Sequence, residues 1–388
     1  MMNTSELKNY LYNLGGASRG LDNFSDFLAK YDNPQNKFKC IHVLGTNGKG
    51  STTAILEKLL ENKFCQVATF TSPALIDVFD RIQINRTDIC EDDFTRIFNL
   101  IYKDAKLHQL GFFEILTAIA FIYFAEQNVN YAIIEAGVGG KHDCTSVINA
   151  QVRVLTNVGY DHVDILGASL EEILIQKLGA CKPRDTLITT INEKTLKTIA
   201  EKWCEKNSVS CLFVSNYVEY ELNLLGSHQK QNASLAYECC KVLQLNLTEE
   251  MVKNSFKTVC WRGRFEKIAE NAYIDGAHNI DGIYQSLKTA DQIFGKKNYN
   301  VISSILKGKD VRMFNKVFNE HANKTTFTTF EYLRAYTREE LLEFDVNVNF
   351  NLKQLIDEAI NSNDNYLFTG SLYFITEIIK YLNNKKER

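Results

Sequence analysis

The stretch "IHVLGTNGKGSTT", Ile41 to Thr53, places a glycine-rich turn between an apolar run and a helical pattern. The apolar run before Gly45 predicts a buried strand, and the pattern from Ala54 to Leu60 predicts a helix. The order of strand, turn and helix is typical of a phosphate-binding loop. The usual GxxxxGK[ST] spacing is absent, because the residue five positions before Gly48 is Val43 and not glycine.

The composition of this turn suits an anion despite its spacing. Its glycines let the backbone approach a bulky anion, and the helix that follows directs free N–H groups and its positive dipole end at the same place. Lys49 adds a positive charge, and the hydroxyl of Ser51 or Thr52 can face a magnesium ion shared with phosphates. The alternative is a plain glycine turn without a ligand.

Length and composition restrict the class of protein. A chain of 388 residues is too long for one ordinary core and predicts two domains. The hydrophobic fraction of 45% is that of a globular protein, and the net charge of -3 argues against a large nucleic-acid surface. Small molecules are therefore the expected partners, without nucleic acid.

Targeting and redox features indicate a cytoplasmic protein without a membrane span. The longest apolar run, Ile115 to Ala125, is shorter than the roughly 20 residues needed to cross a bilayer. The N-terminus lacks the basic start and apolar centre of a secretory signal. The ten cysteines form no CxxC pair, which predicts reduced core thiols.

Strand and helix patterns alternate along the chain. The first half has strand patterns at residues 65–70, 131–137 and 152–157 and helical patterns that begin at Glu91 and Glu114. This alternation predicts an α/β fold with a mainly parallel sheet. It restarts after Arg264, with strand patterns at residues 272–274, 301–305, 325–330 and 366–368. We therefore predict domains at residues 1–260 and 261–388.

Polar residues at strand ends are the candidates for a site, because ligands of open α/β sheets bind at the carboxyl ends of the strands. Ser72, Glu135 and the segment after Asn157 are expected to converge on the glycine-rich loop. Glu135 has the position of an acid that holds magnesium, although it could also make a structural hydrogen bond. Ser72 could instead cap a turn before a proline.

Four further segments carry residues that could bind ligands. His162, between two acids, is either a metal ligand or a structural histidine, and Lys177 reads as a surface lysine without further context. Asp275 at a strand end could accept ribose hydroxyls, and His278 could meet a base or a substrate carboxylate. Arg264 could reach phosphates or form a surface ion pair.

An ordered set of motifs resembles the folylpolyglutamate synthase and dihydrofolate synthase family, relatives of the Mur ligases. The motifs are "NPQNKFKCIHVLGTNGKGST", "TSPALIDVFDRI", "IIEAGVGGKHDCTS", "LTNVGYDHVDILG", "HQKQNA", "GRFEKI", "IDGAHNIDG" and "TGSLY". In that family the short GTNGKG[ST] loop is the normal ATP loop. Mur ligases of peptidoglycan synthesis carry an extra N-terminal domain, for which the 44 residues before Gly45 leave no room.

The resemblance implies a fold and a nucleotide site. The fold is a Mur-ligase-type P-loop ATPase domain with a mainly parallel sheet, which binds ATP and folate, and a smaller Rossmann-like C-terminal domain for glutamate ligation. The linker and the second domain would complete an ATP site whose residues are Asn47, Gly48, Lys49, Gly50, Ser51, Asn232, Arg264 and Asp275. A pair of magnesium ions would be held by Ser72, Glu135 and His162. Lys177 would be carbamylated, as in relatives.

The acceptor side departs from the pattern of bifunctional relatives, because Gly111 stands where a threonine is usual before the aromatic pair and Glu114. By resemblance, Phe113 stacks on a pterin ring and Asp143 accepts pterin N–H bonds, with Glu114 beside them. The residues expected to bind glutamate are Arg81, His278 and Ser371.

The expected activity is an ATP-dependent ligase that joins L-glutamate to dihydropteroate, to the γ-carboxylate of reduced folates, or to both, through an acyl phosphate. The residues expected to act in catalysis are Lys49, Lys177, Arg264 and His278. We expect a monomer. The alternatives are an impaired nucleotide-binding regulatory or interaction protein of the same fold, and a different Mur-like amide ligase.

Overall fold

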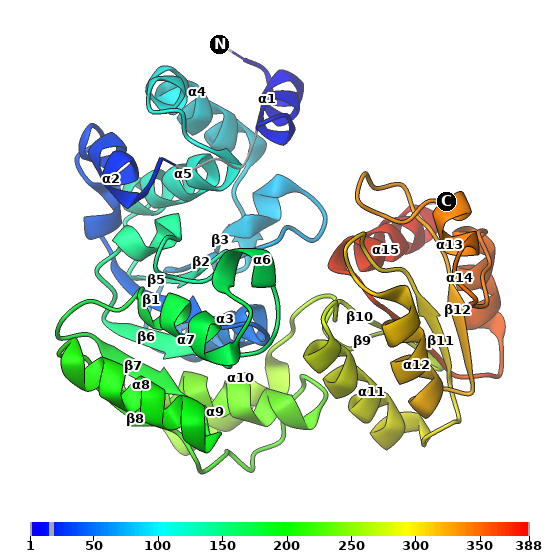
Figure 1. Ribbon diagram of the computed structural model, residues 1–388. Helices are drawn as coiled ribbons and strands as arrows, with labels where there is room; N and C mark the ends of the chain where they lie inside the picture. The colour runs from blue at the N-terminus through cyan, green and yellow to red at the C-terminus, as the bar shows by residue number, and fades with distance from the viewer. Residues whose placement is uncertain (1, 15–18, 387–388) are drawn as a thin grey trace. The chain divides into compact units, whose positions relative to one another are not determined.

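The computed structural model describes residues 2–14 and 19–386. The chain divides into two compact units, Met1–Glu221 with Lys230–Val259, and Leu222–Gln229 with Cys260–Arg388. The segment 222–229, which the sequence assigns to the first domain, groups with the second unit. Figure 1 shows the helices and strands of each unit.

The first unit has an eight-stranded sheet in the order β4-β3-β2-β5-β1-β6-β7-β8. The strands are β1 (Lys39–Leu44), β2 (Val67–Phe70), β3 (Ile82–Ile84), β4 (Thr87–Asp88), β5 (Tyr131–Glu135), β6 (Val152–Leu155), β7 (Thr186–Thr189) and β8 (Ser210–Phe213). The pairs β2–β3 and β3–β4 are antiparallel and the other pairs are parallel. The predicted mainly parallel sheet is therefore confirmed.

Strand β1 lies between β5 and β6, so the glycine-rich turn after it is flanked by the ends of both neighbours. The register pairs Val43 with Glu135 and Leu44 with Leu155. The helices of this unit are α1 (Thr4–Tyr12), α2 (Leu21–Ala29), α3 (Lys49–Leu60), α4 (Glu91–Leu107), α5 (Phe112–Glu126), α6 (Val163–Leu166), α7 (Leu170–Leu178), α8 (Lys194–Lys206), α9 (Ser227–Val242) and α10 (Glu249–Thr258). The start of α9, up to Gln229, groups with the second unit.

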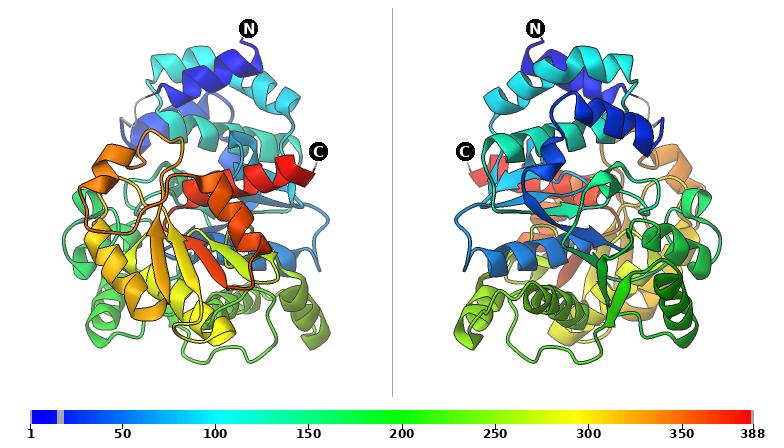
Figure 2. Two further views of the ribbon diagram at one scale, coloured as in Figure 1. Left: turned by 90° about the vertical axis from the view of Figure 1, so that its right-hand side faces the viewer. Right: turned by 90° about the vertical axis from the view of Figure 1, so that its left-hand side faces the viewer.

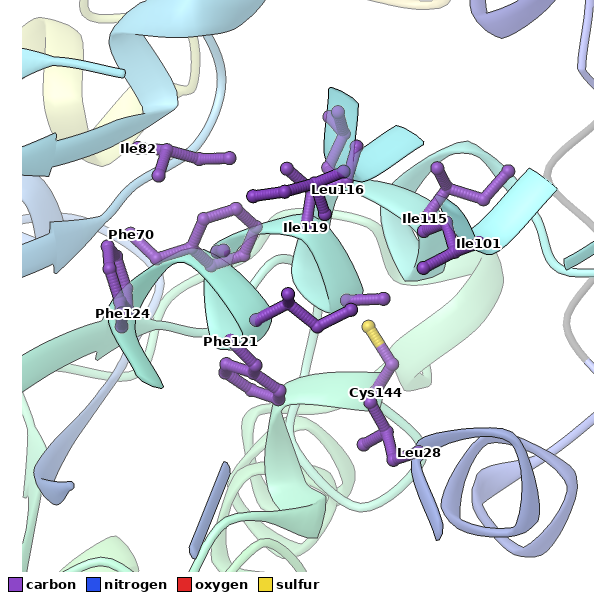
Figure 3. Close-up of a cluster of buried hydrophobic side chains, with 14 of the residues drawn as sticks. Leu28, Phe70, Ile82, Ile101, Ile115, Leu116, Ile119, Phe121, Phe124 and Cys144 are labelled. Atoms are coloured by element: carbon purple, nitrogen blue, oxygen red, sulfur yellow. The ribbon is translucent and has the colours of Figure 1, made fainter. Parts of the chain in front are cut away.

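The helical spacing predicted after Glu91 is confirmed in α4. Its first turn carries three acids, as the helix dipole favours, and Phe94, Ile97, Phe98 and Ile101 are buried in the core. Figure 3 shows this core, in which side chains of α2, α4 and α5 meet those of β2 and β3. Helix α5 is apolar on nearly all sides and is buried along most of its length.

One face of the sheet packs against two groups of helices, α4 with α5 and α7 with α8. Cys40 packs in the core beneath α4 and α5, and Leu44 packs in a second core with residues of α7 and α8. Because these residues lie four apart on β1, they point to the same face of the sheet. Helix α3 packs against β1, β2 and β5 and is itself covered by α10.

The second unit has a five-stranded sheet in the order β12-β11-β13-β10-β9. Its strands are β9 (Glu266–Ala269), β10 (Ala272–Asp275), β11 (Asn300–Ser303), β12 (Lys324–Phe327) and β13 (Tyr366–Thr369), and only β9, which the sequence pattern missed, is antiparallel to its neighbour. The helices are α11 (Ile280–Phe294), α12 (Val311–His321), α13 (Arg338–Leu342), α14 (Leu352–Asn361) and α15 (Leu372–Lys386). Figure 2 shows the strands of this sheet between helices.

All ten cysteines are free. Five of them are buried, but Cys65, Cys90 and Cys260 are exposed, so the prediction of core thiols is wrong for these three. They lie in loops or at a helix start, where apolar spacing around them gives no signal of burial. Among residues 2–14 and 19–386, no helix combines the length and apolar character that a membrane crossing requires.

Candidate active site

The glycine-rich loop is held in shape by the end of β6. The Thr46 N–H donates to the Asn157 carbonyl at 3.2 Å, and the Asn47 N–H donates to Asn157 Oδ1 at 2.9 Å. The Thr156 hydroxyl donates to the Asn47 carbonyl at 2.6 Å. The predicted convergence of the segment after β6 on this loop is therefore present in the structure.

Glycine is required at two positions of the loop. Gly45 has φ +147°, and a Cβ there would overlap the hydroxyl oxygen of Thr156. Gly48, the residue before α3, has φ +83°, and a Cβ there would lie 2.5 Å from Asn232 Oδ1. The structure thus places the buried Asn232 of α9 directly against the loop, as expected for a residue of the same site.

Lys49 is the first residue of α3, and its side chain curls over the loop. Its Nζ donates to the carbonyls of Gly45 and Thr46 at 3.2 Å each and lies 4.0 Å from Glu135 Oε1. The backbone N–H groups in the first turn of α3, the helix dipole and the ammonium group all favour an anion at this place. The arrangement can bind the phosphates of a nucleotide.

Glu135, the last residue of β5, is 3% exposed and lies beside Ser72. The Ser72 N–H approaches Glu135 Oε2 at 3.4 Å. Lys49 follows the turn after β1, Glu135 ends β5 and Ser72 follows β2, and they are brought together because these strands are neighbours in the sheet. The carboxylate of Glu135 and the hydroxyls of Ser72 and Ser51 supply oxygen ligands of the kind that magnesium prefers. Magnesium also retains water and binds phosphates.

His162 lies in the segment after β6 and precedes α6 with φ +50°. Its side chain is exposed, and its backbone N–H donates to Asp161 Oδ1 at 3.1 Å. In the part of the chain that the structure describes, no group of three or more His, Cys, Asp or Glu residues could hold a metal ion. The role of His162 as a metal ligand stays a prediction.

The side chain of Lys177 on α7 is buried, so the interpretation of this residue as a surface lysine is wrong. Burial, followed by repulsion from Lys49, lowers the pKa of Lys177 to about 7, and Asp161 and Asp143 offset part of the shift. A lysine in apolar surroundings loses its proton easily, since the charged form is poorly solvated. Near neutral pH a large fraction of this amine is therefore uncharged and nucleophilic.

Phe113 and Asp143 meet over Gly137, two residues beyond Glu135. A Cβ at Gly137 would lie 2.7 Å from the Phe113 ring and 3.1 Å from Asp143 Oδ2. Phe113 also packs against Phe70, with ring centroids 5.5 Å apart. The structure therefore brings together the aromatic ring and the acid that the sequence assigns to the acceptor.

The two acids of this region hold backbone groups. Glu114 is buried, and its Oε2 accepts from the Gly111 N–H at 2.8 Å, which caps the start of α5. Asp143 Oδ2 accepts from the Val138 N–H at 2.8 Å. Arg81 lies nearby, with its guanidinium 5.5 Å from the centroid of the Phe112 ring. Contacts of these residues with a pterin or with glutamate stay predictions.

The predicted residues of the second unit gather at the carboxyl ends of β10 and β13. Asp275 Oδ2 accepts from the Phe265 N–H at 2.8 Å, and its Oδ1 accepts from the Ala277 N–H at 3.0 Å. The Arg264 guanidinium lies so close over Gly276 that a side chain there would collide with it. His278 and the buried Ser371 follow β10 and β13, which are parallel neighbours.

Comparison with known proteins decides the family. Residues 43–211 match the model of the Mur ligase middle domain. The protein named dihydrofolate synthase/folylpolyglutamate synthase of Bacillus subtilis (strain 168) is 30% identical to this chain over 95% of the chain and 96% of that protein. The chain belongs to the dihydrofolate synthase/folylpolyglutamate synthase family. The resemblance of its motifs to this family is therefore confirmed.

Solved structures of family members share the fold. Escherichia coli FolC in complex with ADP has a TM-score of 0.89 at 22% identity and covers 100% of this chain and 98% of that chain. Mycobacterium tuberculosis folylpolyglutamate synthase, complexed with ADP and AMPPCP, has a TM-score of 0.86 at 24% identity, with 98% of each chain covered. The Mur-ligase-type fold predicted for this family member is confirmed.

One polar residue of this synthase-family chain escaped the sequence reasoning. His228 lies in the second unit against Gly226, where a Cβ would be 2.6 Å from its ring. Burial lowers the pKa of His228, with Asp275 raising it and Arg264 lowering it, so the ring lies near both. The motif "HQKQNA" contained the signal, but only its Asn232 was assigned a role.

Proposed function

We propose that this protein is an ATP-dependent ligase that adds L-glutamate to dihydropteroate, to the γ-carboxylate of reduced folates, or to both. The observation that carries the proposal is the phosphate-binding arrangement of the first unit. There Lys49, the first residue of α3, places its Nζ 4.0 Å from Oε1 of Glu135. The names of the related synthases support the amide-forming reaction. The nucleotides named for the two related structures support ATP as the co-substrate.

The reaction needs no nucleophile from the protein. An oxygen of the acceptor carboxylate attacks the γ-phosphorus of ATP, which forms an acyl phosphate and releases ADP. The amine of glutamate then attacks the acyl carbon, loses a proton and displaces inorganic phosphate. The protein accelerates these steps by positioning and charge neutralisation, for which Lys49, the loop N–H groups and the start of α3 are suited.

Magnesium would be held by Ser72 and Glu135, with His162 as the third proposed ligand. When bound, a pair of ions would neutralise the charge that develops on the transferred phosphoryl group. The remaining ATP contacts are proposed for Asn47, Gly48, Gly50, Ser51, Asn232, Arg264 and Asp275. Asn232 has the strongest support, because it touches the loop at Gly48.

Carbamylation of Lys177 is part of the proposal. The neutral amine attacks the carbon of CO₂ and loses a proton, which gives a carbamate anion. Burial and the lowered pKa of about 7 support this step, because they supply the uncharged amine at neutral pH. The modification replaces repulsion between Lys177 and Lys49 by attraction and provides an oxygen donor suited to a metal site.

Substrate contacts follow the same proposal. Phe113 stacks on the pterin, with Asp143 and Glu114 beside it, while Arg81, His278 and Ser371 bind glutamate. The close approach of Phe113 and Asp143 over Gly137 supports the acceptor side. We further propose a cytoplasmic monomer that acts on small molecules and not on nucleic acid. The net charge of -3 supports the part of this proposal that concerns nucleic acid.

An assay of ADP release with two acceptors tests the function. We expect ADP release that requires both glutamate and a pterin acceptor, and a comparison of dihydropteroate with tetrahydrofolate will show which acceptor is preferred. The opposing hypothesis is a nucleotide-binding regulatory protein that has lost ligation. ATP binding without any release of ADP that depends on glutamate and acceptor would favour that hypothesis.

Phe113→Leu is expected to raise the KM for the acceptor roughly 3- to 10-fold, because aromatic stacking contributes about 0.5–1.5 kcal/mol beyond burial. The KM for ATP should change little. Phe64→Leu is the matched control, since Phe64 also packs against another ring, that of Tyr131, at the start of β5. Steady-state kinetics with acceptor and ATP varied separately check the result, and equal changes in both variants would contradict it.

A further inference from the structure

A buried row of polar side chains runs from β6 to the loop that follows β5. Arg153 and His42 are register partners on β6 and β1, and both are 0% exposed. Arg153 Nη1 lies 2.5 Å from His42 Nδ1, and His42 Nε2 lies 2.8 Å from Thr145 Oγ1. Thr145 Oγ1 lies 2.5 Å from Asp143 Oδ1.

The direction of every hydrogen bond in this row follows from its first member. A guanidinium can only donate, so His42 Nδ1 accepts and the ring proton is on Nε2. The Nε2–H therefore donates to Thr145 Oγ1, which leaves the Thr145 hydroxyl proton for Asp143 Oδ1. Burial, with Arg153 adding repulsion, holds the pKa of His42 well below its usual range, which agrees with a neutral ring.

The outer end of the row is anchored by an ion pair. Arg153 Nε donates to Asp185 Oδ2 at 2.5 Å, and its Nη2 donates to the Ile148 carbonyl at 3.3 Å. The Lys182 N–H also donates to Asp185 Oδ2, at 2.8 Å. The guanidinium therefore has little freedom to turn away from His42.

The inner end of the row closes the loop between Gly137 and Thr145. Asp143 Oδ1 accepts from both the hydroxyl and the N–H of Thr145, and its Oδ2 accepts from the Val138 N–H. The carboxylate thus joins the two ends of the loop. Its oxygens therefore accept from three donors of this segment, the Val138 N–H, the Thr145 N–H and the Thr145 hydroxyl. Only the Thr145 hydroxyl also contacts His42, which fixes the direction in which it donates.

This loop carries the contacts of the proposed acceptor side. Gly137 lies against Phe113, and Gly140 lies so close to the Lys177 carbonyl that a Cβ would be 2.7 Å from it. The Lys141 N–H donates to the Gln176 carbonyl at 2.7 Å. A shift of the loop would therefore change its contacts with the Phe113 ring and its contacts with the backbone of Gln176 and Lys177 together.

We propose that His42 and Thr145 are positioning residues, which act through Asp143 to hold the Gly137–Thr145 loop in the geometry that the acceptor requires. The substrate named here rests on the proposed function, whereas the effect on the loop does not. A buried polar row of this kind stabilises one arrangement, because any other leaves a buried donor or acceptor without a partner. Neither residue needs to touch a substrate.

The kinetic test uses Thr145→Val and Thr145→Ser. The valine has nearly the same shape but cannot donate to Asp143, and we expect the KM for the acceptor to rise roughly tenfold, the order expected when a hydrogen bond to a charged group is lost. The KM for ATP should remain within about twofold, and Thr145→Ser should restore the acceptor KM. Equal changes in both KM values, or no rescue by serine, would overturn the proposal.

Hydrogen exchange of the Val138 and Thr145 amides gives a readout that needs no substrate. These amides should exchange faster in Thr145→Val and in His42→Asn, whose shorter side chain can still accept from Arg153 but does not reach Thr145. The double variant should be little worse than either single one, because both break the same row. Additive effects or unchanged exchange would contradict the inference, even in a protein without ligase activity.

Discussion

Lys49→Ala is expected to abolish ATP-dependent ligation while the fold remains intact. The Nζ of this lysine lies over the carbonyls of Gly45 and Thr46 and faces Glu135, at the place where the loop and α3 favour an anion. Removal of one preorganised group that stabilises transition-state charge typically costs about 10²–10³ in rate. Because Lys49 would also bind the ground-state phosphates, we expect a loss of roughly a thousandfold or more in kcat/KM.

Lys58→Ala provides the matched control for this result. Lys58 lies on the same helix and makes an ion pair with Glu61 at 2.9 Å, near the end of α3 that is remote from the loop. It should retain nearly full activity and a similar melting temperature. ADP release and thermal unfolding measured on both variants separate a catalytic defect from a folding defect. Retained ligation by Lys49→Ala would refute the assignment of the loop.

Lys177→Ala is expected to lose most of its activity and to regain part of it with added short-chain carboxylic acids. The variant lacks the amine that CO₂ would modify, and it leaves space beside Lys49 that a small carboxylate can enter. We expect kcat to fall by roughly 100-fold, the order expected when one preorganised group that stabilises transition-state charge is removed. The measurement is the rate of ADP release with acetate or propionate titrated into the assay.

Two further variants sharpen this test. Lys177→Arg keeps the positive charge but cannot form a carbamate, so it should stay inactive with or without bicarbonate. Lys202→Ala, at an exposed position of α8, should be fully active and indifferent to short-chain acids. In the unmodified protein, reactivation by bicarbonate should be faster above about pH 7, because the pKa of Lys177 is about 7. Full activity of Lys177→Ala without rescue would remove the carbamate from the mechanism.

The glycine-rich loop and the strand-end acid were predictable because they depend on local order and on a general property of parallel sheets. Glycines before a helix that begins with lysine specify an anion site through backbone geometry alone. Glu135 ends β5 and Ser72 follows the end of β2, and the carboxyl ends of parallel strands meet at one edge of the sheet. Their position beside Lys49 therefore followed from the pattern of strands and helices.

The environments of Lys177 and His228 could not be predicted in the same way. The spacing of residues along α7 does not show that the side chain of Lys177 is buried. The lowered pKa of Lys177 arises from this burial and from Lys49, which is distant in sequence. The pKa of His228 likewise depends on Asp275 and Arg264, which join it only in the folded second unit. The local sequence does not determine how close these charged groups lie to Lys177 and His228 in the folded chain.

Chain order alone thus sufficed for the alternation of strands and helices, the glycine-rich turn and the family, although it missed short strands such as β9. Each of these features depends on residues close together or on motifs in a set order. Folding was needed to join His42, Arg153, Thr145 and Asp143, which come from two strands and a loop. Hydrogen-bond direction and desolvation depend on distances between such segments. For that reason the buried row, the lowered pKa of Lys177 and the capping role of Glu114 became visible only in three dimensions.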